Sequence, residues 1–261
     1  MNPILRLEHL ELCMLEPGAM ELDVSALHQG YVRGVKQRGG EINTLSGVVA
    51  LRRAGEVWRA TTANGQEYEA PAVVNASGAW GDEVAAMAGV RAVGLHPLRR
   101  TLFMISAPDA IETEHLPLTA DVAGTFYIKP EGATQYLCSP ADETPSPPCD
   151  AKVDEIDVAR AIERIREATI LDGRHVRSSW AGLRTFTADR SPIACFDPEH
   201  EGFFWLVGQG GYGIQTAPAL ARAAAALVRR HDLPADLAAR GLEASHLDRA
   251  RLAGATQLAG H

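Results

Sequence analysis

The stretch WLVGQGGYGIQTAPALARAAAALV, residues 205–228, decides how the rest of the chain is interpreted. Three glycines in it, Gly208, Gly210 and Gly213, have the spacing G-x-G-x-x-G. The apolar residues around its start, FFWLVGQ, are typical of a strand that is buried on both faces. An alanine-rich segment follows, so the stretch is expected to form a strand, a glycine-rich turn and a helix.

The helix after the glycines is predicted over residues 216–231. Thr216 is a suitable N-cap, and Pro218 then lies in the first turn. The glycine spacing resembles that of a dinucleotide-binding loop, which needs a second strand ending in an acidic residue about twenty positions later. Asp232 stands at that distance, but RRHDLPADL is not a strand, and this disfavours the dinucleotide hypothesis.

Two other interpretations of the turn remain. The glycines can serve only to pack strand and helix tightly together. Alternatively, they allow a planar ligand to approach the backbone, while the N–H groups of the helix start stabilise negative charge on it. A reduced flavin carries negative charge on its pyrimidine edge and needs such donors.

Composition excludes several classes of function. The chain has 261 residues, 46% of them hydrophobic and 22% charged, and a formal net charge of -8. A nucleic-acid partner is not expected, because phosphate binding needs a basic face. The four cysteines lack the spacing of a zinc site, and the histidines show no ligand spacing, so no metal is expected. We expect no membrane span, no signal peptide and a cytoplasmic location.

Periodicity predicts a mixed α/β fold, with strands and helices interspersed along the whole chain. A hairpin is expected at Asn64-Gly65, and another around Glu131-Gly132. ADETPSPPCD, residues 141–150, is expected to be a surface loop. Helices are predicted over residues 24–38, 81–89 and 154–170. Strands are predicted within residues 47–55, 56–65, 66–78, 95–106, 125–130, 134–140, 175–186 and 203–209.

Two of these helices have a predicted buried face. Residues 24–38 place Leu27, Tyr31, Val32 and Val35 on one side, and residues 154–170 do the same with Ile156, Ala159, Ile162 and Ile165. The acid-rich segment 142–164 is interpreted as a solvated helix face together with its lead-in.

Three segments in order, ALHQGYVRGVKQRGG, VVNASGAWGDEVAAMAG and WAGLRTFTADRSPIACFDPEHEGFFWLVGQGGYGIQTAPAL, resemble the FAD-dependent amino-acid oxidase and dehydrogenase family. That family includes glycine oxidase, sarcosine oxidase and D-amino-acid oxidase. The likeness is greatest to bacterial D-arginine dehydrogenase-type D-amino-acid dehydrogenases. It implies a two-lobed FAD-dependent oxidoreductase fold. Residues 1–90 and 184–261 would be parts of the FAD-binding domain, and residues 91–183 a mixed-sheet substrate-binding domain.

The resemblance also reveals a difference. Family members begin with a βαβ unit whose G-x-G-x-x-G loop and acidic residue hold the FAD pyrophosphate and ribose. This chain has neither, so its FAD domain is expected to be incomplete, short of the family pattern by roughly a hundred residues. The sheet edge where those strands belong would then be exposed.

The resemblance assigns Arg184, in AGLRTF, to the substrate carboxylate, which a guanidinium grips in bidentate fashion. Arg100 matches a second carboxylate-side arginine, and Tyr127 a tyrosine of the substrate pocket. Arg99 should face away from Arg100, because strand side chains alternate. Gly124 stands where members with long basic substrates have an acidic residue, so a smaller or apolar D-amino acid is as well suited as arginine.

Two segments match the cofactor-binding parts of the family. The small residues Ala76, Ser77, Gly78 and Ala79 match the turn that passes the cofactor, and the alternative is a tight strand–helix turn without a ligand. The adjacent Trp80 is a candidate for the cofactor site or for the core. The loop over the flavin ring corresponds to Gln209, Gly210, Gly211, Tyr212, Gly213, Ile214 and Gln215.

Two hypotheses about function follow from the resemblance. In the first, the chain is part of a flavoenzyme that oxidises the CH–NH bond of a D-amino acid or a similar small amine. A hydride passes to FAD, the imine hydrolyses, and an electron acceptor that the sequence does not identify reoxidises the flavin. In the second, the chain is a truncated, non-catalytic remnant that does not hold FAD. An NAD enzyme is a distant third.

Overall fold

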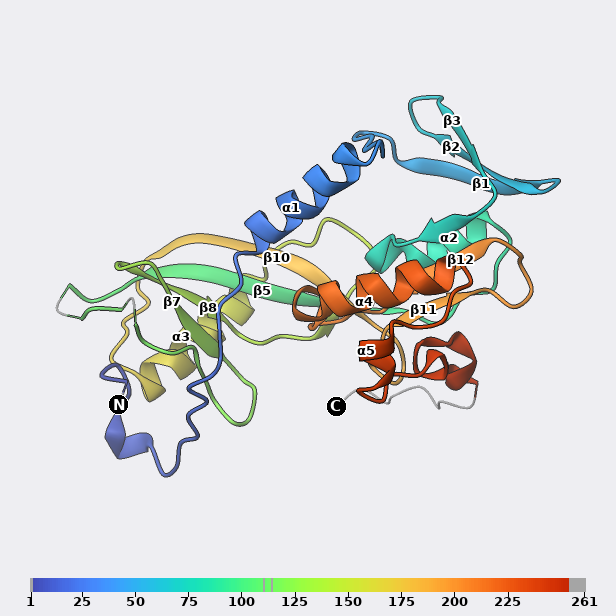
Figure 1. The fold of residues 1–261 in the computed structure, drawn as a ribbon. Helices are drawn as coiled ribbons and strands as arrows, with labels where there is room; N and C mark the ends of the chain where they lie inside the picture. Colours follow the sequence, from blue (N-terminus) through green and yellow to red (C-terminus); the bar gives the residue numbers. More distant parts are fainter. Residues whose placement is uncertain (1, 110, 114, 254–261) are drawn as a thin grey trace. The chain divides into compact units, whose positions relative to one another are not determined.

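The computed structural model describes residues 2–109, 111–113 and 115–253. The chain forms two compact units, whose elements are labelled in Figure 1. The first unit comprises Met1–Gly18 and Pro97–Arg184, and the second Ala19–His96 and Thr185–His261. Each unit is therefore assembled from two separate segments of sequence.

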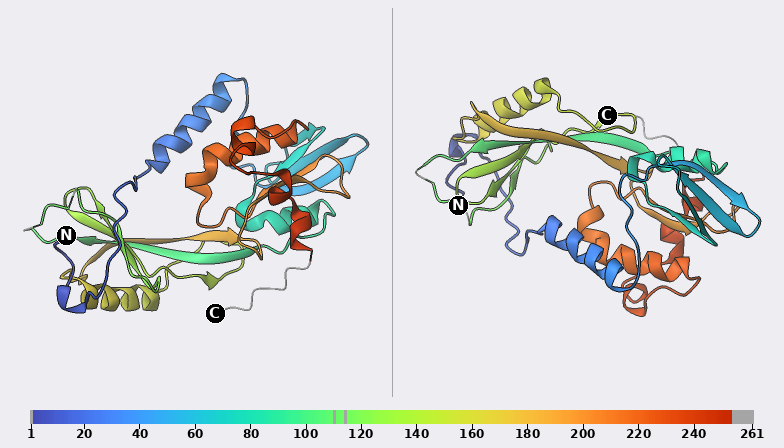
Figure 2. Two further views of the ribbon diagram at one scale, coloured as in Figure 1. Left: turned by 60° about the horizontal axis from the view of Figure 1, so that its bottom comes forward. Right: turned by 90° about the horizontal axis from the view of Figure 1, so that it is seen from above.

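The first unit is built on a six-stranded sheet with the order β10-β5-β8-β7-β6, to which β9 adds beside β5. Its two long strands, β5 and β10, are neighbours in this sheet and lie side by side in Figures 1 and 2. The predicted hairpin at Glu131-Gly132 joins β7 to β8, and Gly132 has the positive φ of 61° that its turn requires. The strands are β5 (His96–Ser106), β6 (Thr119–Ala120), β7 (Tyr127–Glu131), β8 (Gln135–Ser139), β9 (Thr144–Pro145) and β10 (Val176–Phe186).

Helix α3 (Glu155–Ala168) covers one face of this sheet (Figure 2). The predicted buried face of the helix is only partly correct. Ile165 is buried as expected, but Ile156 is 61% exposed, and Val158 and Ala161 are buried instead. Both sets of residues have helical spacing. Val158, Ala161 and Ile165 are the set that faces the apolar residues of the sheet, and they are therefore buried. The buried residues of this core are Ile4, Phe103, Ile105, Phe126, Ile128, Tyr136, Cys138, Val158, Ala161, Ile165 and Leu171.

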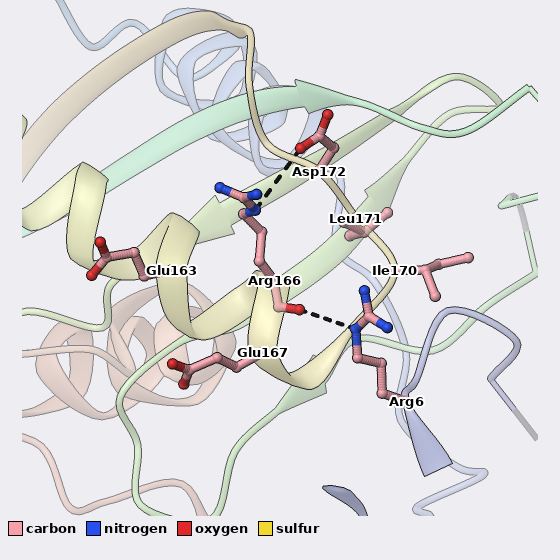
Figure 3. A pocket seen from close by; sticks show the side chains of 7 residues that line it. All are labelled: Arg6, Glu163, Arg166, Glu167, Ile170, Leu171 and Asp172. Carbon is pink, nitrogen blue, oxygen red and sulfur yellow. Dashed lines mark hydrogen bonds and ion pairs between the residues drawn. The ribbon is translucent and has the colours of Figure 1, made fainter. Parts of the chain in front are cut away.

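The N-terminal segment belongs to the same core. Ile4 is fully buried, and its carbonyl accepts a hydrogen bond of 2.9 Å from the N–H of Ile170. The Nε of Arg6 donates to the Arg166 carbonyl at 3.1 Å (Figure 3). It also donates to the Thr169 carbonyl at 2.8 Å, and so satisfies groups at the end of α3. A short helix, η1 (Leu7–His9), follows.

Figure 3 shows the open surface cleft beside this junction. Its polar side chains serve the fold, as in the Arg166–Asp172 ion pair of 3.9 Å. No residue that the sequence singles out for catalysis or cofactor binding lines it. The lining residues are Arg6, Glu163, Arg166, Glu167, Ile170, Leu171 and Asp172.

The second unit contains an antiparallel meander of β1 (Val48–Ala54), β2 (Val57–Thr62) and β3 (Glu67–Ala70). The hairpin predicted at Asn64-Gly65 joins β2 to β3. Gly65 adopts φ 82°, and its N–H donates to the Thr62 carbonyl at 2.8 Å. This local signal was sufficient because the turn needs a left-handed residue, which glycine provides without strain.

A three-stranded sheet of order β11-β12-β4 forms the centre of the second unit. Its strands are β4 (Val73–Asn75), β11 (Ile193–Phe196) and β12 (Phe203–Val207). Alternate residues of β12 enter two cores: Phe203, Trp205 and Val207 face one, and Phe204 faces the other. The prediction of a strand buried on both faces is thus confirmed. One core includes Leu51, Trp58, Ala85, Val90 and Ile193, and the other Ala194, Ala223, Ala224, Leu237 and Leu247.

Helix α4 (Gly213–Val228) packs beside β11 and begins three residues earlier than predicted. Thr216 is not its N-cap: the hydroxyl donates to the Tyr212 carbonyl at 2.8 Å from inside the helix. Pro218 likewise lies inside the helix and not in the first turn. Besides α1, described below, the other described helices of the unit are η2 (Gly78–Trp80), α2 (Gly81–Met87), α5 (Ala235–Ala238), η3 (Ala244–Leu247) and η4 (Arg249–Leu252).

Helix α1 (Val24–Gln37) lies where the sequence predicts it and is capped by the side chain of Asp23, which accepts from the Ala26 N–H. Its predicted buried face is not buried in the described structure: Leu27 and Val32 are half-buried, and Tyr31 and Val35 are 46% and 42% exposed. Within the described ranges, no helix has both the length and the apolarity that crossing a membrane requires.

Candidate functional site

The edge of the second unit's sheet brings together the two segments predicted to contact a cofactor. Strands β4 and β12 run parallel, and Asn75 pairs with Trp205 in register. Their carboxyl ends therefore lie at the same edge, followed by residues 76–80 after β4 and residues 208–215 after β12. In open α/β sheets, ligands bind outside the carboxyl ends of parallel strands.

The segment after β4 is held by Asn75, whose side chain is 2% exposed. Its Nδ2 donates to the Gly81 carbonyl at 2.8 Å, and its Oδ1 accepts from the Ser77 hydroxyl at 2.6 Å. Gly78 turns the chain with φ 58°. Trp80 is 43% exposed, which excludes a core role, and Ala76 is exposed as well. The sequence did not single out Asn75, although a buried amide at a strand end is a typical anchor for a turn.

The segment after β12 turns sharply at two glycines. Gly208 and Gly210 have φ 78° and 56°. A Cβ on Gly210 would lie 2.3 Å from Phe186, and the Gly210 N–H donates to the Thr185 carbonyl at 2.9 Å. These two glycines are therefore required by the packing of the loop itself, as the tight-packing interpretation proposes.

The residues that follow these glycines are open to a ligand. Tyr212, the N-cap residue of α4, makes no capping hydrogen bond through its side chain, and its ring is 58% exposed. Ile214 is 45% exposed, and Gly211 and Gln215 are exposed too. The N–H groups of the first helical turn thus lack a side-chain cap and carry the positive end of the helix dipole.

The first unit gathers the three residues that the resemblance assigns to the substrate. Arg184 lies near the end of β10, Arg100 on the neighbouring strand β5, and Tyr127 at the start of β7. Both Arg100 and Tyr127 act electrostatically on Arg184. Residues alternate along β5, so Arg100 lies on the sheet face opposite Phe103 and α3.

The two neighbouring arginines of β5 have separate partners, as alternation predicts. Arg99 turns to α3, where it bonds to Asp157 at 2.6 Å. Arg100 is 8% exposed: its Nε donates to the Asp142 carbonyl at 2.8 Å, and its NH2 approaches Glu143 Oε1 at 3.3 Å. Much of the bonding capacity and charge of Arg100 is therefore used within the protein.

Arg184 differs from Arg100 in this respect. It is half-buried, and its guanidinium makes no hydrogen bond or ion pair with any described residue. Burial and the nearby Arg100 lower the pKa of Arg184, while Tyr127, Glu143 and Asp142 oppose that shift. The Arg184 guanidinium therefore has N–H donors that no described residue occupies, and such a group is suited to bind an anion.

The acidic residues after β8 were interpreted from the sequence as solvated, and for two of them this is wrong. The side chains of Asp142 and Asp157 are only 6% and 19% exposed. Asp142 accepts from the Thr101 N–H at 2.7 Å and from its hydroxyl at 3.0 Å. The surface loop predicted over residues 141–150 also contains strand β9, which pairs with β5. The pair Arg99-Arg100 on β5 was the available signal, because a buried or half-buried cation needs a nearby acid.

Comparisons with known proteins define the class. The family model described as FAD dependent oxidoreductase matches residues 3–227. The chain belongs to this family, whose cofactor is FAD, and the fold class and cofactor expected from the sequence are thereby confirmed.

Individual relatives agree with this assignment. The FAD-dependent oxidoreductase domain-containing protein 1 of Bos taurus is 29% identical over 77% of this chain and 45% of its own length. Glycine oxidase of Geobacillus kaustophilus is 27% identical over 91% of this chain and 61% of its own length. The chain thus spans about half the length of the curated relatives that it matches.

Solved structures share the fold. The crystal structure of the same glycine oxidase superposes with a TM-score of 0.69 over 90% of this chain and 58% of that chain, at 24% identity. The iminodiacetate oxidase of Chelativorans sp. BNC1 gives a TM-score of 0.70 over 86% of this chain and 57% of that chain, at 15% identity.

The residues present fit one end of FAD. The exposed, uncapped start of α4 offers backbone donors of the kind that a negatively charged flavin pyrimidine edge requires. For the pyrophosphate end, the described residues contain no glycine-rich βαβ unit. The described part of the chain also holds no cluster of His, Cys, Asp or Glu suited to a metal ion.

Proposed function

We propose that this chain is part of a FAD-dependent oxidoreductase that oxidises the CH–NH bond of a D-amino acid or a similar small amino acid. The observation that carries the proposal is the Arg184 guanidinium, half-buried beside Arg100 and without an acceptor among the described residues. A carboxylate would fill its unused donors in bidentate geometry. Similar proteins named as oxidases of glycine and of iminodiacetate support the proposal, since both compounds combine an amine with a carboxylate.

The proposed roles combine the family resemblance with the positions of the residues. Arg184 binds the substrate carboxylate, and Tyr127, on the same sheet, offers a hydroxyl to the substrate. Residues 76–80 and 209–215 hold the flavin ring. FAD, when bound, supplies the hydride acceptor. The protein contributes mainly by orienting the substrate and by stabilising the negative charge that develops on the reduced ring.

A small or apolar side chain suits the substrate at least as well as a basic one. Gly124 contributes no carboxylate before Tyr127. The nearest acid in that turn, Asp121, is occupied by the N–H groups of Thr125 and Phe126, at 2.6 and 3.0 Å, and by the Thr125 hydroxyl. Closeness to D-arginine dehydrogenase-type enzymes remains a prediction.

The second candidate is a non-catalytic remnant that holds no FAD. The observation that favours it is the three-stranded sheet in which β4, a strand paired on one side only, forms the edge beside the cofactor segments. This architecture contributes residues to the ring end of the cofactor and lacks, in its described part, the loop that would hold the pyrophosphate.

The deciding experiment measures FAD content and reduction in the purified chain. About one FAD per chain, bleached anaerobically by a D-amino acid, glycine or sarcosine, is expected from the enzyme proposal. Bound FAD that none of these compounds reduces would contradict it, and a chain that takes up no added FAD supports the remnant.

Arg184→Lys tests the carboxylate role. Lysine keeps the charge but loses the planar fork, so we expect substrate binding to weaken about 10- to 100-fold, corresponding to roughly 1.5–3 kcal/mol for a charged hydrogen bond. Arg174→Lys is the matched control, because Arg174 is 71% exposed and pairs with Asp172. Equal effects of the two substitutions would argue against a substrate role for Arg184.

A further inference from the structure

Helix η4, near the C-terminus of the second unit, contacts the chain on both sides of strand β11. Arg249 pairs with Asp197, the residue directly after β11, and its N–H donates to the Sγ of Cys195 at 3.4 Å. Arg251 pairs with Asp189 ahead of β11: its Nε lies 2.7 Å from Oδ2, and its Nη2 lies 3.4 Å from Oδ1. The two arginines of η4 thus fix both ends of one strand.

The guanidinium of Arg251 is fully engaged by the chain. The side chains of Arg251 and Asp189 are 17% and 33% exposed. Besides its contacts with Asp189, Arg251 donates through Nη2 to the Ser191 carbonyl and through Nη1 to the Asp248 carbonyl, at 2.5 and 2.8 Å. All three nitrogens of the planar fork therefore have acceptors, and such a fork can hold a loop in one conformation.

Asp189 belongs to a turn, residues 187–191, that lies between β10 and β11. The hydroxyl oxygen of Thr187, a residue that is 1% exposed, lies 2.8 Å from the Oδ1 of Asp189 and 2.7 Å from the Ser191 carbonyl oxygen. The same Oδ1 accepts from the Ser191 N–H at 3.1 Å. The Asp189 carboxylate therefore joins the two ends of the turn, and Arg251 holds that carboxylate from outside the turn.

The turn 187–191 supports the glycine loop after β12. A Cβ on Gly208 would lie 2.8 Å from the Cγ2 of Thr187 and 3.6 Å from the Ser191 carbonyl oxygen. Phe186, the residue before Thr187, packs in the same way against Gly210. A displacement of the turn would therefore move both glycines, together with the exposed residues that follow them.

We propose that Arg251 is a positioning residue for FAD: by holding the turn 187–191, it fixes the glycine loop that places residues 211–215 at the flavin ring. The contacts run from Arg251 to Asp189, then to Thr187, and from Thr187 to Gly208. This inference rests on the proposed function, because that function assigns residues 209–215 to the cofactor. It adds η4 to the parts of the chain on which FAD affinity depends.

Amide hydrogen exchange in the FAD-free chain, followed by NMR, tests the effect on the loop. The Gly210 N–H, bonded to the Thr185 carbonyl at 2.9 Å, reports on the loop, and the Val73 N–H, bonded to the Gly202 carbonyl at 2.9 Å, reports on the sheet. In Arg251→Gln, the Gly210 amide should exchange about 10-fold faster, as the loss of a charged hydrogen bond would cause, while the Val73 amide is unchanged. A merely structural role of Arg251 would accelerate both.

Fluorescence titration of the full chain with FAD tests the effect on the cofactor. Arg251→Gln should weaken FAD binding about 10-fold, in step with the change in exchange. Arg251→Lys keeps an ion pair with Asp189 and should recover part of the affinity. The matched control is Arg59→Gln, which removes the bond of 2.6 Å between Arg59 and Glu69 on β2 and β3 of the same unit. It should leave both the exchange of Gly210 and the FAD affinity unchanged.

A double-mutant cycle tests the route through Asp189. Asp189→Asn alone should weaken FAD binding to a similar extent. The combination of Arg251→Gln with Asp189→Asn should bind FAD no worse than either single variant, because two residues that act through one contact are not additive. Additive losses would show that the two residues act separately, which would overturn the proposal.

Three further results would overturn the inference. Arg251→Gln leaves the FAD affinity unchanged; it weakens FAD binding without any change in exchange at Gly210; or it accelerates exchange at Gly210 and Val73 equally. Failure of the proposed function has a different signature: FAD binds and responds to Arg251→Gln as expected, yet no D-amino acid, glycine or sarcosine reduces it. A chain that takes up no FAD would reject both proposals.

Discussion

Single residues of β5 show how one strand serves two purposes. Arg99 ties the sheet to α3 through Asp157, and Arg100, the next residue, lies on the opposite face with Glu143. A period of two was enough to predict that the pair would separate. It was not enough to find their partners, because Asp142 and Asp157 are distant in sequence and only the folded sheet and helix bring them near. The two arginines could thus be located from the sequence, whereas the acidic residues that pair with them could not.

Tyr136 offers a prediction about stability. Its side chain is fully buried, and its hydroxyl has no hydrogen-bond partner among the described residues. An unsatisfied buried hydroxyl costs roughly 1–3 kcal/mol. Tyr136→Phe should therefore raise the free energy of unfolding by about 1 kcal/mol, measured by urea denaturation. Tyr68→Phe, which removes an exposed hydroxyl bonded to Gln66, should change it by less than about 0.5 kcal/mol.

The stabilisation expected from Tyr136→Phe should depend on pH. Burial raises the pKa of Tyr136. The unfolded chain ionises its tyrosines near pH 10, whereas the folded chain keeps this phenol neutral. Stability is unaffected below about pH 10 and decreases above it. The advantage of Tyr136→Phe should therefore grow in alkaline solution, and an advantage that shrinks there would show that the hydroxyl is solvated.

At the scale of elements, the strands, the hairpins with strong turn signals and the positions of α1, α2 and α3 were predictable, whereas the start of α4 and the buried faces of the helices were not. Thr216 and Pro218 are typical of a helix start, yet α4 begins at Gly213. The loop before it is closed by contacts with Thr185 and Phe186, which lie on β10 and are invisible to a local pattern. The buried face of α3 was misassigned for a similar reason, since two apolar stripes compete and only the sheet decides between them.

The role of the loop before α4 can be tested by substituting Gly210. Gly210→Ala places a methyl group 2.3 Å from Phe186 and forces a side chain into a left-handed conformation, which alone costs roughly 1–2 kcal/mol. We expect the loop to move and FAD binding, measured by fluorescence titration, to weaken at least 10-fold. Gly47→Ala is the control, because a Cβ there meets nothing within 4 Å. An unchanged FAD affinity in Gly210→Ala would show that this loop does not contribute to FAD binding.

On the scale of the whole molecule, the fold class followed from the spacing of strands and helices and from the family resemblance. The grouping of the chain into units did not follow from local pattern. Residues 2–18 show no strong periodicity, yet Ile4 is fully buried against residues from the other end of the first unit. A contact across so many residues leaves no signature in a short window of sequence.

The four cysteines allow a test that covers both units. Cys13 and Cys149 are exposed, Cys138 is buried, and Cys195 is half-buried. Burial raises the pKa of Cys195 to about 11 and that of Cys138 further. Because the thiolate is the reactive form, a thiol reagent such as DTNB at pH 8 should label two cysteines rapidly and all four after denaturation. Cys13→Ser should reduce the rapid phase to one. Rapid labelling of all four would contradict the described packing.

The burial of Ile4 in the core of the first unit has a consequence for biosynthesis. Its core partner Leu171 leaves the ribosome long after Ile4 does, and the second unit likewise waits for the strand and helix that complete its sheet. Nascent chains therefore expose apolar surface through most of translation. Such long-range contacts slow folding, and the exposed surface is a target for chaperones. Lower growth temperature and a greater supply of chaperones should therefore increase the yield of native protein.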